Sequence, residues 1–150
     1  DMLIAPNSRN EFDRLATKLA GATKASAILF AEIFAASPRL MTLRAMGKTE
    51  RLDQLLACEA WTEAAIELVT LEAPEWRIQR LCLDDREWLC SLTRFPDLPE
   101  WLDESAEGRH PLITLAILDA LLVARARAAV TYPSTPWQLP GVAADCADYR

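Results

Sequence analysis

Residues 76–95, WRIQRLCLDDREWLCSLTRF, decide the fold class. They read as two short strands that fold back on each other over a turn at residues 84–87. In the second strand apolar and polar positions alternate with the period of two that is typical of a half-buried strand: Trp88, Cys90 and Leu92 against Leu89, Ser91 and Thr93. Helical patterns precede and follow the hairpin. We therefore expect an α+β domain with N-terminal helices, a long helix, an antiparallel β-hairpin and a buried C-terminal helix.

The pattern leaves the face and the register of the hairpin open. In the first strand, one set of apolar residues (Trp76, Ile78, Cys82) competes with another (Leu81, Leu83) for the core face. A three-residue loop over 85–87 would place Cys82 opposite Cys90, whereas a two-residue loop over 85–86 would not. The sequence does not decide between these registers.

The helices are bounded by capping residues and prolines. After a loose lead-in, Asn10 is the expected cap of a first helical region, which Ser37-Pro38 ends. Gly21 either kinks this region or divides it into two helices. A short helical connector over 40–47 ends at Gly47, and Thr49 then caps the long helix, which is expected to reach about residue 71.

The C-terminal part combines an irregular segment, a helix and a tail. Residues 100–109 are expected to form an acidic loop or a short helix, and Pro111 fits the first turn of the final helix. Residues 112–123 are almost entirely apolar, so this helix should be buried. We expect a single α+β domain over 1–130 and a Pro-rich extended tail over 131–150.

Composition excludes several classes of function. The chain has 150 residues and a formal net charge of −6, which disfavours binding to nucleic acid and to anionic membranes, since both attract cations. Its four cysteines match no C-x-x-C or zinc-finger spacing, and so few in a chain with ample core indicate reduced thiols in the cytoplasm. Residues 1–4 carry no basic n-region, so we expect no secretory signal peptide.

Three segments, TLRAMGKTERLDQLLACEAWTEAAIELV, WRIQRLCLDDREWLCSL and HPLITLAILDALLVARARAAV, resemble a group of small uncharacterised bacterial proteins. The resemblance covers roughly residues 41–130. It implies one domain with the elements in this order, and it implies no activity, cofactor or catalytic residue.

Candidate catalytic residues are few. The chain has a single histidine, His110, which excludes a multi-histidine zinc site. A Cys–His nucleophilic pair would need Cys90 or Cys82 beside this histidine. We interpret the two cysteines as small apolar strand residues and His110 as a capping or surface residue. The acidic pairs at 84–85 and 103–104 fall in turns, and no phosphate-binding or nucleophile-elbow motif occurs. We expect no cofactor and no metal.

Aromatic side chains are the candidate binding residues. Trp101 and Trp137 stand in Pro-rich irregular segments, where aromatic anchors suit partner binding; the alternative is that each covers the core as a lid. Trp88, Phe30 and Phe34 complete the set.

The leading hypothesis is a non-enzymatic cytoplasmic protein that acts through protein–protein contacts. A homodimer is expected to form through the N-terminal helices, which carry small residues at 20, 21 and 25 and bulky apolar ones from Ile28 to Phe34. One alternative is a binder of a small apolar or aromatic ligand between the hairpin and the helices. The other is a cysteine-dependent enzyme that uses Cys90 and His110.

Overall fold

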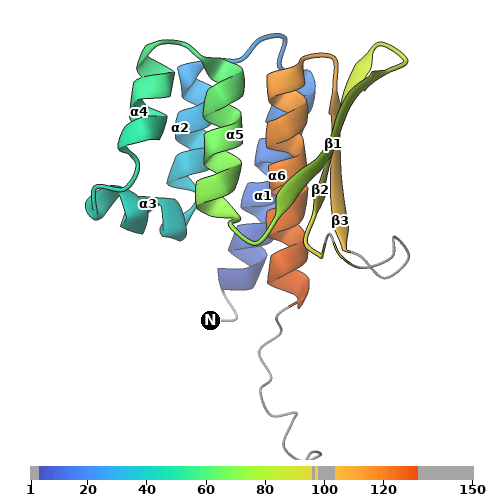
Figure 1. Ribbon diagram of the computed structural model, residues 1–150. Helices are drawn as coiled ribbons and strands as arrows, with labels where there is room; N and C mark the ends of the chain where they lie inside the picture. Colours follow the sequence, from blue (N-terminus) through green and yellow to red (C-terminus); the bar gives the residue numbers. More distant parts are fainter. Residues whose placement is uncertain (1–3, 96, 98–103, 132–150) are drawn as a thin grey trace, which may run out of the picture.

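The computed structural model describes residues 4–95, 97 and 104–131. Its elements, in order, are α1 (Ile4–Gly21), α2 (Ala27–Ala35), α3 (Pro38–Ala45), α4 (Glu50–Ala57), α5 (Trp61–Glu72), β1 (Arg77–Asp84), β2 (Glu87–Thr93), β3 (Ser105–His110) and α6 (Ile113–Thr131). The strands form one antiparallel sheet in the order β1-β2-β3. Figure 1 shows the helices gathered on one face of this sheet. The α+β class and the buried C-terminal helix are thus confirmed.

The N-terminal region is two helices with a linker between them. Helix α1 begins at Ile4, earlier than the expected cap at Asn10, and ends at Gly21. Helix α2 begins after Ser26, whose hydroxyl accepts a hydrogen bond from the backbone N–H of Leu29. Ser37 caps α3 in the same way, through the N–H of Leu40, and Pro38 occupies the first turn of that helix.

The long helix expected over residues 49–71 is instead two helices, α4 and α5. Glu59 adopts a left-handed conformation with φ of 57°. The N–H of Ala60 donates to the carbonyl of Leu55, and that of Glu59 to Leu56. These two bonds form a Schellman motif, which ends α4 and lets α5 start in a new direction.

A third strand, β3, occupies Ser105–His110, within the region where a loop or short helix was expected over 100–109; residues 100–103 lie outside the described residues. It pairs with β2, so that Gly108 lies opposite Cys90 and His110 opposite Trp88. Strand β2 lies between the other two strands, and its residues from Leu89 to Thr93 are all buried, whereas the alternation in the sequence predicted a half-buried strand.

The hairpin has a two-residue turn. Asp85 and Arg86 both have positive φ, 55° and 69°, as a type I′ turn requires. Cys82 therefore lies opposite Leu89, and Cys90 lies opposite Leu81. A bulge at Gln79 shifts the alternation of β1. Neither expected residue set holds the core face, since Ile78 and Leu81 are the β1 residues that pack against the core.

Helix α6 is the centre of the core and packs against β2, β3, α1 and α5. Leu115, Leu118 and Leu121 on it are fully buried. Its approach to β3 depends on Gly108, where a Cβ atom would lie 2.5 Å from the carbonyl oxygen of Ala116 and 2.9 Å from the Cα of Ala120.

A buried ion pair joins the helices at the other end of the core. Arg125 Nε lies 2.9 Å from Glu72 Oε2, and both side chains are less than a tenth exposed. The guanidinium also donates to the carbonyl of Ala36, and the hydroxyl of Ser37 donates to Glu72. The pair therefore ties α6 and α5 to the junction of α2 and α3.

Candidate interaction surfaces

The two candidate catalytic residues lie on neighbouring strands of the sheet, Cys90 on β2 and His110 at the end of β3. Cys90 is fully buried, and burial, followed by the charge of Asp119, raises the pKa of its thiol to about 12. His110 ends β3 and is 5% exposed, so of the two expected roles, capping or surface, the surface role is excluded. Its Nδ1 accepts a hydrogen bond from the N–H of Leu112 just before α6, which is a local capping role. This environment disfavours the thiolate that nucleophilic catalysis needs.

The candidate aromatic binding residues are separated. Trp101 and Trp137 lie outside the described residues. Trp88 is half-buried on the core face of β2. Phe30 and Phe34 are 2% and 5% exposed on α2, whereas Ile28 on the same helix, which also belongs to the expected dimer interface, is 67% exposed.

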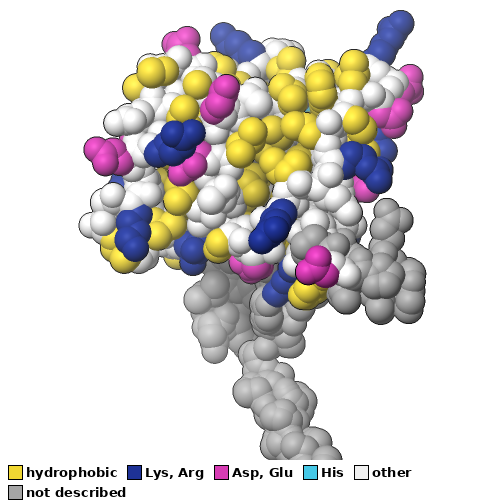
Figure 2. All heavy atoms as spheres, viewed as in Figure 1, with side chains coloured by type: hydrophobic (Ala, Val, Ile, Leu, Met, Phe, Trp, Pro, Cys, Tyr) yellow, Lys and Arg dark blue, Asp and Glu magenta, His cyan; other side chains and the backbone are white. Residues whose placement is uncertain are grey.

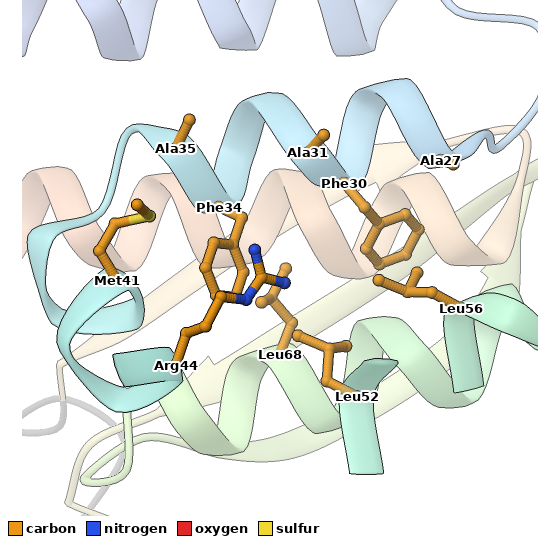
Figure 3. A pocket seen from close by; sticks show the side chains of 10 residues that line it. All are labelled: Ala27, Phe30, Ala31, Phe34, Ala35, Met41, Arg44, Leu52, Leu56 and Leu68. Carbon is orange, nitrogen blue, oxygen red and sulfur yellow. The ribbon is translucent and has the colours of Figure 1, made fainter. Parts of the chain in front are cut away.

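Phe30 and Phe34 do line a cavity of about 250 Å³ between α2, α3, α4 and α5. Phe30 stacks on Trp61 with the ring centroids 5.8 Å apart. Figure 3 shows the two phenylalanines pointing from α2 toward leucines of α4 and α5. The other lining residues, which sequence patterns did not identify, are Ala27, Ala31, Ala35, Met41, Arg44, Leu52, Leu56 and Leu68.

One cation stands in the lining of this cavity. Arg44 lies over the ring of Phe34, with its Cζ 3.9 Å from the ring centroid, and it is paired with Asp53 at 3.0 Å. Thr49 donates to the same carboxylate. The cavity is therefore apolar inside, and its charged residue already has a partner. Such a space suits a small uncharged apolar or aromatic molecule.

The second surface is the free edge of the sheet at β1. Helix α6 covers β2 and β3, and no helix of the described ranges packs on β1 to a comparable extent. Leu83, which faces the same side as the buried residues of the sheet, is 60% exposed, and Ile78 and Leu81 are half-buried. Figure 2 shows hydrophobic side chains gathered over α5, α6 and β1 on the face toward the viewer.

The opposite edge of the sheet, at β3, is capped at one residue, Arg109. The outward N–H of Arg109 donates to Asp119 Oδ2 on α6. Burial raises the pKa of Asp119, while this hydrogen bond and the charge of His110 oppose the rise. Charged or capped edges resist pairing with other strands. The two edges of the sheet therefore differ: α6 packs against β3 and caps it at Arg109, and no helix of the described ranges packs on β1 to that extent.

The part of the chain that the structure describes contains no cluster of three or more His, Cys, Asp or Glu residues able to hold a metal ion. Within the same residues, none of the helices combines the length and the apolar character needed to cross a membrane. Comparison with protein families, with curated proteins and with solved structures finds no match to this chain.

Proposed function

We propose that this chain is a non-enzymatic cytoplasmic protein that acts through protein–protein contacts, and that the free edge of β1 is its binding surface. The observation that carries the proposal is the combination at this edge of backbone groups that have no partner among the described residues and an exposed apolar side chain, Leu83, 60% exposed. Edge strands accept a further strand readily, because main-chain hydrogen bonds supply affinity and alternate side chains supply specificity. The cytoplasmic location is supported by Cys58, Cys82 and Cys90, which are all free.

The test compares two charged substitutions in extract of the native cell. Leu83→Lys adds a charge to the open edge, and Met46→Lys adds the same charge at a residue that is 57% exposed after α3. The wild-type chain and Met46→Lys should elute from size-exclusion chromatography above the monomer size, and Leu83→Lys should elute as a monomer. Elution of the wild-type chain as a monomer would contradict the proposal, as would equal behaviour of the two variants.

The cavity among the helices favours a second function, the binding of a small apolar or aromatic ligand. It lies among four helices rather than between hairpin and helices, and its volume of about 250 Å³ exceeds the roughly 150 Å³ of an apolar cavity that holds benzene. Benzene and indole should raise the melting temperature of the wild-type chain. They should not do so for Ala31→Phe, which adds a ring to the cavity lining. The absence of a shift in the wild-type chain at saturating benzene would exclude this function.

A further inference from the structure

The open edge of β1 is regular over only five residues. The bulge at Gln79 interrupts the pairing of β1 with β2, and the type I′ turn begins at Asp85. Between them, Arg80–Asp84 pair one-to-one with β2. The centre of this regular segment is Cys82.

The hydrogen-bond pattern of the hairpin determines which backbone groups face outward. In a two-residue turn the flanking residues, here Asp84 and Glu87, form a hydrogen-bonded pair. Hydrogen-bonded and non-hydrogen-bonded pairs alternate along an antiparallel ladder. The N–H and C=O groups of Leu81 and Leu83 therefore point away from β2. The hydrogen bond from the N–H of Arg109 to Asp119 agrees with this alternation. Leu89 has Cys82 and Arg109 as register partners, and the N–H of Arg109 points away from it, so Leu89 forms its hydrogen-bonded pair with Cys82.

We propose that this segment pairs antiparallel with the same segment of a second copy of the chain, about a twofold axis through Cys82. The inference rests on the proposed function and names its partner. Leu81 would exchange backbone hydrogen bonds with Leu83 of the second copy, and the two Cys82 residues would face each other. Shifting the register by two residues would bring the bulge residue Gln79 opposite Leu83, or the turn residue Asp85 opposite Leu81, so this register alone pairs all five regular residues.

The side chains agree with the same register. On the outer face, Arg80 would lie opposite Asp84 of the second copy, twice by symmetry. On the inner face, Leu81 would lie opposite Leu83 and cover its exposed surface. Opposite charges and apolar pairs across strands both stabilise a sheet. Asp84 Oδ2 already lies 3.5 Å from Arg109 Nη1 of its own chain. The Asp84 side chain is 59% exposed, so it can accept a second cation.

Pairing of this kind would produce a six-stranded sheet with the helices of both copies on the same face. The apolar surface over α5, α6 and β1 in Figure 2 would then face its counterpart across the axis. This contact is isologous, because the same residues of both copies form it, and it pairs both the outward backbone groups and the opposite charges.

Charge reversal tests the register with purified full-length chain. Light scattering between about 1 and 100 µM, the range suited to a modest interface, should detect a dimer of the wild-type chain. Arg80→Asp alone and Asp84→Arg alone should each weaken the dimer at least about tenfold, since two attractive pairs become repulsive. An equimolar mixture of the two variants should form a heterodimer, in which every pair is again attractive.

Cys82 supplies a second readout, in a background where Cys58 and Cys146 are replaced by Ser. Non-hydrogen-bonded pairs have Cα atoms about 4.5 Å apart, within the range of a disulfide. Diamide, which takes up the two electrons and two protons of two thiols, should link Cys82 to Cys82. Cys82→Ser is the control.

Three results would overturn the inference. The chain could remain a monomer at the highest concentration and form no disulfide through Cys82. A dimer could form whose stability is unchanged by the charge reversals, or one that is abolished by the substitution Ile28→Lys on α2. The first result, together with a complex in native extract that Leu83→Lys disrupts, would mean that the β1 edge binds a different protein, and the proposed function would stand. If the chain were a monomer in the native extract as well, both the proposed function and this inference would be contradicted.

Discussion

Of the glycines that the structure describes, Gly108 should tolerate an added methyl group least. The new Cβ would approach the backbone N of Ala120, would lie 2.5 Å from the carbonyl oxygen of Ala116, and would lie 2.9 Å from the Cα of Ala120. Ordinary contact distances are about 3.5–4.0 Å, so α6 and β3 would have to separate by roughly 1 Å. Because all three neighbours are backbone atoms, no side-chain rotation can relieve the overlap.

Overpacking of a core typically costs about 1–3 kcal/mol, and this site belongs at the upper end, since moving α6 also loosens the packing of Leu115 and Leu118. A loss of about 3 kcal/mol would lower the melting temperature of a chain of this length by about 6–12 °C. Urea unfolding followed by circular dichroism at the helix band would measure the loss.

Two other glycines serve as controls. At Gly21, at the end of α1, a Cβ atom would have no residue outside its own helical turn within 4 Å, and Ala there should be neutral or stabilising by up to about 1 kcal/mol. Gly47 also has open space but a φ of +73°, so Ala should cost about 1–2 kcal/mol through backbone strain alone. If Gly108→Ala were as stable as Gly21→Ala, the close packing of β3 on α6 would be refuted.

Four further predictions concern the core and its buried polar groups. Leu118→Ala should cost about 2–5 kcal/mol in urea unfolding, because Leu118 is fully buried and a cavity would remain. Cys90→Ser should cost about 1–3 kcal/mol by burying an unpaired hydroxyl, which a melting temperature equal to that of the wild type would contradict. The pKa of Asp119 is raised in the folded chain, so its contribution to stability is fully present below the unfolded value of 3.8 and is lost as pH rises through the folded value. Asp119→Asn should therefore gain in stability relative to wild type as pH rises from 3.8, and a difference that does not change with pH would count against this. Arg125→Ala should cost about 3–5 kcal/mol by leaving the buried carboxylate of Glu72 unpaired, and Glu72→Gln in the same chain should recover part of the loss in the same assay.

The helix boundaries show what sequence patterns can and cannot predict. Gly47 and Glu59 end α3 and α4 by the same Schellman motif, with the N–H of Lys48 donating to Leu43 in the first case. Gly47 was predicted because glycine favours positive φ. Glu59 was not, because a non-glycine residue in that conformation leaves no compositional signal and the apolar pattern continues across it.

Strand β3 was missed for a related reason. Its sequence, SAEGRH, is poor in the β-branched and aromatic residues that favour strands. It is a strand because β2 offers it a partner and because its small inward residues, Ala106 and Gly108, admit α6. The alternation of buried and exposed positions is present from Ala106 to His110, but five residues are too few to separate it from a loop.

The candidate site was predictable only in part. Phe30 and Phe34 stand out as aromatic residues on an apolar helix, and they do line the cavity. The opposite wall comes from Leu52, Leu56 and Leu68, which share no motif with them and meet them only through the packing of α4 and α5. The difference between the two edges of the sheet was equally hidden, since it depends on a third strand that the sequence did not indicate.

The open edge at β1 and the close packing at β3 have a common cause. Helix α6 can approach β3 closely because Gly108 has no side chain, and from there Asp119 reaches the outward N–H of Arg109. A helix that packs over β3 and β2 cannot also cover β1, because the sheet is twisted, so the apolar residues of β1 extend beyond the helix. A larger residue at 108 would push α6 away from β3, remove the protection of that edge and change the exposure of Leu83. In the Gly108→Ala chain the N–H of Arg109 should therefore lose its protection, so that the edge at β3 becomes as open as the edge at β1. Backbone hydrogen exchange should accelerate more at Arg109 than at Leu83.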